Sequence, residues 1–326
     1  MKHDLKVTVA LITLFLASQI IGIAVAYMYI DQEETARTGQ VTYNSLPYGL
    51  ERPEVEQSSS YIFILISLLI ATLILLVLVR FRKGNLWRLW FFSSAVLCLA
   101  VSLSAFINSM VAVIASIALA FFKVFKPNIV IHNLTELFMY GGLAAIFVPI
   151  MNLFAAIMLL IVVAFYDMFA VWQSKHMIRL ARFQTQSRVF AGIFIPYRRD
   201  DEGRDDEVQA DNRAAIGSRP DAKAVKTTSA AKQKHKTREG QASEACQACP
   251  SHGSAIIGGG DIGLPILFAG VAMKSLGLLK SLVIPLFVTA ALLALLVLGK
   301  RDRFYPAIPF ITAGCLIGYA FTRFIL

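Results

Sequence analysis

The sequence predicts an all-α membrane protein with nine transmembrane helices, and three observations support this prediction. Hydrophobic residues make up 57% of the 326 residues, whereas soluble domains are nearer half apolar. The hydrophobic residues come in long blocks that are separated by short polar breaks. Most of these blocks approach the roughly 20 residues that a helix needs to cross a hydrocarbon core about 30 Å thick.

The apolar segments can be bounded in chain order. The first exceeds the about 7–15 apolar residues of a signal peptide, so we expect a retained helix. Asn108 and Ser109 divide the third segment from the fourth, because the apolar stretch of residues 86–122 is too long for one helix. The nine segments are residues 5–30, 61–81, 87–107, 109–125, 135–150, 152–176, 254–273, 281–299 and 304–325.

These segments divide the chain into three parts. Residues 1–176 hold the first six helices, residues 177–253 form a hydrophilic cytoplasmic loop, and residues 254–326 hold the last three helices. Residues 198–250 are rich in Arg, Asp, Lys, Ala and Ser. That composition buries too little apolar surface to fold by itself, so we expect disorder there. Just before it, residues 188–195 are predicted to form a strand or an interfacial segment.

Basic residues predict the orientation in the membrane. Most lysine and arginine residues of the short loops, Lys123 among them, fall on the same side as the N-terminus. The positive-inside rule then places the N-terminus in the cytoplasm and the C-terminus outside. Lys274 and Lys280 lie on the other side without reversing this bias. The glycosylation sequon Asn133-Leu134-Thr135 falls inside, so we expect it to be unused.

The net charge of +10 has the same explanation. No aromatic and basic surface module accompanies the charge, so no nucleic-acid partner is expected. Cys246, Cys249 and His252 could supply part of a zinc site. A full set of ligands is not evident, so we prefer an incidental pair of loop cysteines and expect no metal or cofactor, although metal binding by this group stays open.

Two carboxylates within the apolar segments are the candidate functional residues. Asp167 lies in the sixth segment and Asp261 in the seventh. A carboxylate near the membrane centre costs at least about 2.5–3.5 kcal/mol, and neither residue has a basic partner within a segment. Glu136 differs, since it lies at the edge of the fifth segment, where it is expected to reach water.

The depths of the two aspartates are predicted to match. Asp167 precedes Lys175 by 8 residues, and Asp261 follows Gly253 by 8 residues. At 1.5 Å per helical residue, each lies about 12 Å from the cytoplasmic boundary. Consecutive helices usually pack as neighbours, so the two side chains should meet. In such a pair, one carboxylate can take a proton from water while its protonated partner donates to a peptide carbonyl.

Two further motifs contain residues that disfavour a regular helix. Gly258-Gly259-Gly260 precedes Asp261 and would let another backbone approach closely. Pro306-Ala307-Ile308-Pro309 opens the ninth segment. Irregular backbone at membrane depth is tolerated only where it is buried in protein or lines a water-filled cavity. A plain helix start explains the proline motif equally well.

Together, these motifs resemble the presenilin and signal peptide peptidase family of intramembrane aspartyl proteases, in particular a microbial, archaeal homologue of presenilin. The family has Tyr-Asp in the sixth helix, Gly-x-Gly-Asp in the seventh and Pro-Ala-Leu in the ninth. This chain has Tyr166-Asp167, Gly258-Gly259-Gly260-Asp261 and Pro306-Ala307-Ile308. Ile308 departs from the family leucine.

The resemblance implies an endopeptidase that cuts transmembrane segments of membrane proteins or peptides within a lipid bilayer. It implies that Asp167 and Asp261 are catalytic and that the substrate side is shaped by Tyr166, Gly258, Gly259, Gly260, Pro306, Ala307, Ile308 and Pro309. An unwound substrate needs backbone partners in a dry site, so we expect strand addition to residues 188–195 or to Pro306–Pro309. A homo-oligomer is compatible with the sequence.

Three other classes of protein could carry intramembrane carboxylates. Secondary transporters and ion channels do so, although they often have internal repeats and none is evident in this sequence. Prepilin-type peptidases also use Gly-x-x-Asp, but their motifs do not include the proline element. A purely structural scaffold would leave both buried carboxylates unexplained. Replacing either aspartate and assaying cleavage of a transmembrane peptide separates these classes.

Overall fold

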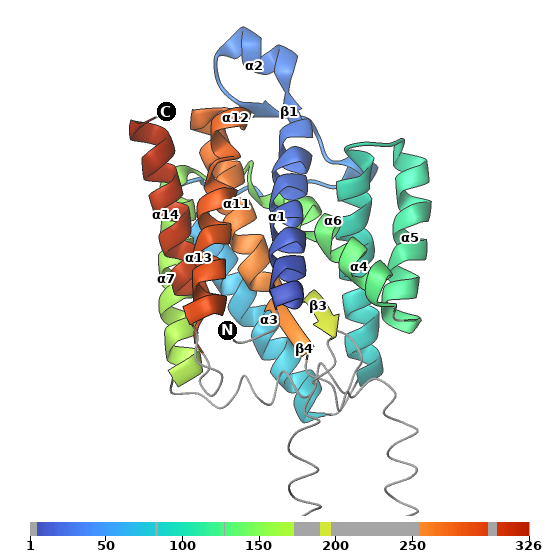
Figure 1. Cartoon of the computed structure of the whole chain (residues 1–326). Coiled ribbons are helices and arrows are strands. Elements are labelled where there is room, and N and C mark those ends of the chain that lie inside the picture. Colours follow the sequence, from blue (N-terminus) through green and yellow to red (C-terminus); the bar gives the residue numbers. More distant parts are fainter. Residues whose placement is uncertain are drawn as a thin grey trace, which may run out of the picture. The chain divides into compact units, whose positions relative to one another are not determined.

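The computed structural model describes residues 5–81, 84–126, 128–172, 190–196, 254–298 and 305–325. Contacts divide the chain into one unit of residues 1–195 and 256–326 and a second of residues 196–255. Almost all of the second unit lies outside the described residues, as do the predicted disorder over 198–250 and Cys246, Cys249 and His252. The fold below is therefore that of the first unit (Figure 1).

A helix lies in each of the nine apolar segments, within the part of the chain that the structure describes. Asn108 and Asn128 cap the fourth and fifth of these helices by accepting hydrogen bonds from Met110 N and Val130 N. The helices are α1 (Leu5–Met28), α3 (Ser60–Arg80), α4 (Gly84–Ser104), α5 (Ser109–Phe125), α6 (Ile129–Phe147), α7 (Leu153–Trp172), α11 (Gly259–Leu276), α13 (Ile284–Leu298) and α14 (Ile308–Phe324).

Short elements join these helices. Between α1 and α3, strands β1 (Ile30–Asp31) and β2 (Thr42–Tyr43) pair in antiparallel fashion. The same connection holds the helix α2 (Gln32–Thr38) and a 3-10 turn at Pro47–Gly49, and α12 (Leu278–Ser281) precedes α13. Strands β3 (Gly192–Pro196) and β4 (Ser254–Gly258) form a second two-stranded sheet.

The helices support a multi-pass membrane protein. Six helical stretches among the described residues are long and apolar enough to cross a membrane, namely residues 6–28, 60–78, 84–104, 129–147, 153–170 and 278–298. Helices α5 and α14 are apolar but shorter, at 17 residues each. The predicted number of nine crossings is therefore not confirmed. Helix α3 exposes apolar side chains such as Leu69 and Leu73, as a lipid-facing helix would.

Helix packing places the two aspartate-bearing helices side by side. Helix α7 packs against α11 and α14, and α11 also packs against α14. Helix α1 lies against α6, α11 and α13, so α11 contacts α1 as well as α7 and α14 (Figure 1). On the other flank, α4 packs against α5 and α6.

The seventh segment, residues 254–273, is not helical throughout, which corrects the depth argument for Asp261. Its first five residues are the extended strand β4, and α11 begins only at Gly259. Gly258 is the N-cap, with extended backbone angles (φ −68°, ψ 150°). An extended residue advances about 3.3 Å, more than twice the rise of a helical one. Counting eight helical residues from the boundary to Asp261 was therefore wrong.

Candidate functional site

Asp167 is held by the start of helix α14. Its side chain is only 6% exposed, and its Oδ2 accepts a hydrogen bond from Ile308 N at 3.3 Å. The backbone N–H of Ala307 also faces this carboxyl group. The first N–H groups of a helix have no partner within the helix, so a carboxylate is a favourable acceptor for them. The proline motif thus presents two backbone donors to Asp167.

Asp261 lies in the first turn of α11 and is partly buried. Its carboxyl group turns back toward Gly258, since a methyl group on Gly258 would lie 3.2 Å from Asp261 Oδ2. The backbone of Gly258 interacts with this carboxyl group. The charge of Asp167 also acts on Asp261. The structure therefore brings the two carboxyl groups into electrostatic range, even though the depth argument that predicted their meeting was wrong.

The other predicted site residues differ in how far they are buried. Pro306 is buried, and Pro309 lies in the first turn of α14. Gly260 faces open space, because a methyl group there would meet nothing within 4 Å. Tyr166 is 60% exposed, so its side chain lies largely at the outer surface instead of being buried as Asp167 is.

Gly259 meets a residue that the sequence did not suggest. A methyl group on Gly259 would lie 2.5 Å from Tyr140 Oη, which is closer than packed atoms allow. One turn later, a methyl group on Gly263 would lie 3.4 Å from the ring of Tyr140. The first turn of α11 therefore rests directly on Tyr140, and glycine at position 259 is required by this close approach.

Glu136 is buried, which corrects the expectation that it reaches water. It is 0% exposed and forms an ion pair with Lys123, which is 3% exposed. Helix α6 begins at Ile129, six residues before the predicted start, so Glu136 lies two turns inside it. Lys123 is likewise not a loop residue, because it belongs to the last turn of α5. The sequence signal that was missed is a pair of opposite charges across a short helix connection.

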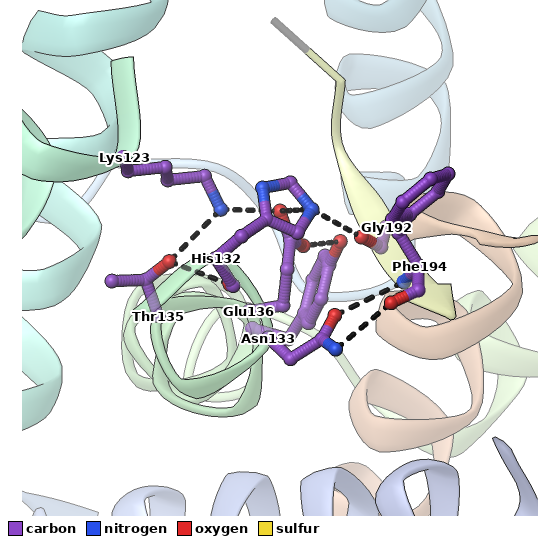
Figure 2. A network of polar contacts seen from close by, with 8 residues as sticks. Lys123, His132, Asn133, Thr135, Glu136, Gly192 and Phe194 are labelled. Carbon is purple, nitrogen blue, oxygen red and sulfur yellow. Dashed lines mark hydrogen bonds and ion pairs between the residues drawn. The ribbon is translucent and has the colours of Figure 1, made fainter. Parts of the chain in front are cut away.

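A network of hydrogen bonds surrounds this ion pair (Figure 2). Lys123 Nζ donates to Thr135 Oγ1 at 3.1 Å as well as to Glu136. Tyr140 Oη donates to the other oxygen of the Glu136 carboxylate. Every polar group of the pair thus has a partner, as a buried ion pair requires.

Two residues at the start of α6 bind strand β3. Asn133 Nδ2 donates to Phe194 O at 2.9 Å, and Phe194 N donates to Asn133 Oδ1 at 3.0 Å. His132 Nε2 lies 2.8 Å from Gly192 O (Figure 2). The strand or interfacial segment expected within residues 188–195 is thus a strand from residue 192 onward, while residues 188 and 189 lie outside the described residues. Asn133 is 8% exposed with its amide bonded on both sides, so the folded protein offers no acceptor for a glycan.

Helix α1 supports α11 just after Asp261. The buried Gln19 Nε2 donates to Ile262 O at 3.0 Å. Pro265 lies one turn further on and has no N–H, so the carbonyl of Asp261 lacks its helical donor. The side chain of Gln19 thus binds α11 next to the point at which the backbone hydrogen bonds of α11 are interrupted. No pattern in the sequence pointed to this residue.

The described residues contain no group of three or more His, Cys, Asp or Glu side chains that could hold a metal ion. The arrangement itself offers two carboxyl groups with backbone groups beside them, the N–H groups of Ala307 and Ile308 at Asp167 and the backbone of Gly258 at Asp261.

Comparisons with known proteins agree on one family. A family model described as signal-peptide peptidase, presenilin aspartyl protease matches residues 12–325. A solved structure of a presenilin family intramembrane aspartate protease, in space group C222, resembles this chain with a TM-score of 0.57 at 16% identity. That match covers 98% of this chain and 99% of the other. A second such structure, in space group P2, gives 0.56 at 17% identity over 97% of each chain. No curated protein matches the sequence.

Proposed function

The chain belongs to the signal-peptide peptidase and presenilin aspartyl protease family, and from this membership we propose that it hydrolyses peptide bonds within transmembrane segments of membrane proteins. Its presenilin-like fold over almost the whole chain supports intramembrane proteolysis. A transporter or ion channel has no comparable support. The observation that carries the proposal is the packing of α7, α11 and α14 against one another, which brings Asp261 within range of the charge of Asp167.

In the proposed mechanism, one carboxyl group of the pair is ionised and the other carries a proton. The ionised group takes a proton from a water molecule, whose oxygen attacks the carbon of the scissile carbonyl. The protonated group donates its proton to the carbonyl oxygen, which gives a neutral diol. When the C–N bond breaks, the group that took the proton from water gives it to the leaving nitrogen, and the other group takes a proton from a diol hydroxyl, so both carboxyl groups finish as they began. The two carboxyl groups of this scheme are those of Asp167 and Asp261.

The proline motif would serve the mechanism by fixing one member of the pair. The N–H groups of Ala307 and Ile308 face Asp167, so this stretch has few donors to offer a substrate. Pro306 and Pro309 have no N–H at all. We therefore assign Pro306–Pro309 to holding Asp167 and no longer expect it to supply both donors and acceptors to an added strand.

The substrate would instead lie along β4. Strand β3 is bonded to β4 on one edge, and the backbone groups of Gly192 and Phe194 on its other edge are bonded to α6. Within the described part of this sheet, a third strand could therefore pair only with the remaining edge of β4, which leads directly to Asp261. Ile256 on β4 is 50% exposed and would contact the substrate there. An added strand satisfies the backbone groups of an unwound substrate in a dry site.

The proposal is tested with Asp167→Ala and Asp261→Ala in purified protein reconstituted into lipid vesicles with a model transmembrane peptide. Each variant is expected to lose cleavage entirely, because neither carboxyl group can take both proton-transfer roles in one step. Asp31→Asn is the matched control, since this carboxylate caps α2 outside the helices that carry the pair. Cleavage by either of the two alanine variants at the wild-type rate would overturn the proposal.

A further inference from the structure

The polar cluster at the start of α6 has no role in the proposed chemistry, yet it is buried and almost fully bonded. Its members come from the last turn of α5 and the first four turns of α6: Lys123, His132, Asn133, Thr135, Glu136 and Tyr140. Burying a lysine and a glutamate within a membrane protein is costly. Such a cluster is therefore expected to serve the site that it touches.

We infer that this cluster is a positioning device for the reaction, which fixes strand β3 and the first turn of α11 and thereby sets the place of Asp261. The inference rests on the proposed function, because it assigns supporting residues to that same site. The members of the cluster are positioning residues and not catalytic ones, since they reach Asp261 through other groups.

The first route from the cluster to the site passes through β3. Gly192 and Phe194 are two residues apart, so their backbone groups point to the same edge of the strand. His132 and Asn133 occupy that edge, and the amide of Asn133 bonds Phe194 N and O as a neighbouring strand would. Helix α6 thus takes the place of a third strand and holds β3 in its position along the sheet.

The second route passes through Tyr140. Its hydroxyl group donates to Glu136, and its ring faces both Gly259 and Gly263 on α11. The charge of Asp261 also acts on Tyr140. A shift of the Tyr140 ring would therefore move the first turn of α11, which carries Asp261 two residues after Gly259.

Both routes meet at Gly259. Gly259 N donates to Ala191 O at 3.2 Å, which ties the start of α11 to the residue that precedes β3. On its other side, Gly259 rests against Tyr140. The turn before Asp261 is thus held by β3 and by α6 together. The ion pair between Lys123 and Glu136 completes the device, because it fixes the acceptor to which Tyr140 is bonded.

A double-mutant cycle tests the Tyr140 route. Gly259→Ala places a methyl group against Tyr140 Oη and is expected to lower kcat by about tenfold or more, with little change in KM. Tyr140→Phe removes that oxygen, after which the nearest ring atoms lie 3.3 Å from the methyl group. Gly259→Ala should therefore cost less in the Tyr140→Phe background than in the wild type. If the fold-losses in kcat of the two single variants simply multiply in the double variant, the inference is refuted.

The matched control for Tyr140→Phe is Tyr29→Phe. Tyr29 is also a 7% exposed tyrosine with a bonded hydroxyl group, but its partners are Val101 O and Ser104 Oγ, away from the candidate site. We expect Tyr140→Phe to lower kcat and Tyr29→Phe to leave the kcat of folded protein unchanged. Equal effects of the two variants on kcat would contradict the inference.

Amide hydrogen exchange tests the β3 route without any use of activity. Asn133→Ala should speed exchange within residues 190–196, because Phe194 N loses its acceptor. Asn108→Ala, which removes a helix-capping asparagine at α5, is the control. Unchanged exchange in Asn133→Ala would overturn the inference.

The two proposals can fail separately. If the variants of Asp167 and Asp261 retained cleavage, the proposed function would be wrong, while the exchange experiment would still report on the cluster. If both aspartate variants were inactive but the cluster variants matched their controls, only the positioning role would be lost.

Discussion

Asp167 is bound by backbone N–H groups, and this has consequences for the side chains around it. The donors belong to Ala307 and Ile308, and any residue other than proline carries such a donor. The proline motif therefore needs to keep the backbone conformation at the start of α14. Pro309 in the first turn favours that shape, because its fixed φ suits the first residues of a helix.

Ile308→Leu should therefore leave the protein active. Leucine keeps the backbone N–H that bonds Asp167 and has the same volume as isoleucine, so kcat is expected to stay within about twofold of the wild type. The measurement is cleavage of a model transmembrane peptide by the purified variant. A loss above about tenfold would mean that the side chain at position 308, and not only its amide, shapes the site.

The ion pair between Lys123 and Glu136 joins helix α5 to helix α6 and ought to matter for stability. In Glu136→Gln, Lys123 keeps its charge without a counter-charge, so the free energy of unfolding in detergent should fall by about 3–5 kcal/mol. Combining Glu136→Gln with Lys123→Met removes both buried charges and should recover most of that loss. The exposed pair Arg37 and Glu34 is the control, for which Glu34→Gln should cost less than about 1 kcal/mol.

Helix positions were predictable from apolar length, but two helix starts were not. Residues 254–258, Ser-Ala-Ile-Ile-Gly, are as apolar as the helix that follows, so hydrophobicity cannot separate strand β4 from α11. The predicted start of α6 is too late because the first turns of this helix carry polar residues. His132, Asn133 and Glu136 look like the end of a loop until their buried partners are known.

The candidate site was also predictable only in part. Asp167 and Asp261 stood out because lone carboxylates are rare in apolar segments. Tyr140 and Gln19 did not, because one tyrosine and one glutamine among apolar residues carry no signal until the fold brings them to α11.

At the scale of the whole molecule, two of the charges used to predict orientation are not loop charges. Lys123 is buried against Glu136, and Lys274 donates to Pro149 O and Met151 O. One comes from each side of the membrane in the prediction, so removing both leaves the bias as it was.

We therefore propose a cytoplasmic N-terminus and an external C-terminus. Alkaline phosphatase fused after the last residue should be active in bacterial cells, because this enzyme folds only outside the cytoplasm. The same reporter fused before the first residue should be inactive. A fluorescent cytoplasmic reporter in each position provides the reciprocal control, and bright fluorescence from the C-terminal fusion would contradict this orientation.

Helix α11 packs against α1 and α7, and α14 packs against α7, so these contacts also make the protein suited to being divided. A break between residues 197 and 253 would yield two polypeptides, one with Asp167 and one with Asp261. Helices from both pieces pack against one another, and β3 would still pair with β4. Under the proposed two-aspartate mechanism neither fragment would act alone, so turnover in a mixture would count reassembled molecules. If the proposed function holds, the divided protein would be a split enzyme whose output measures helix association in a bilayer.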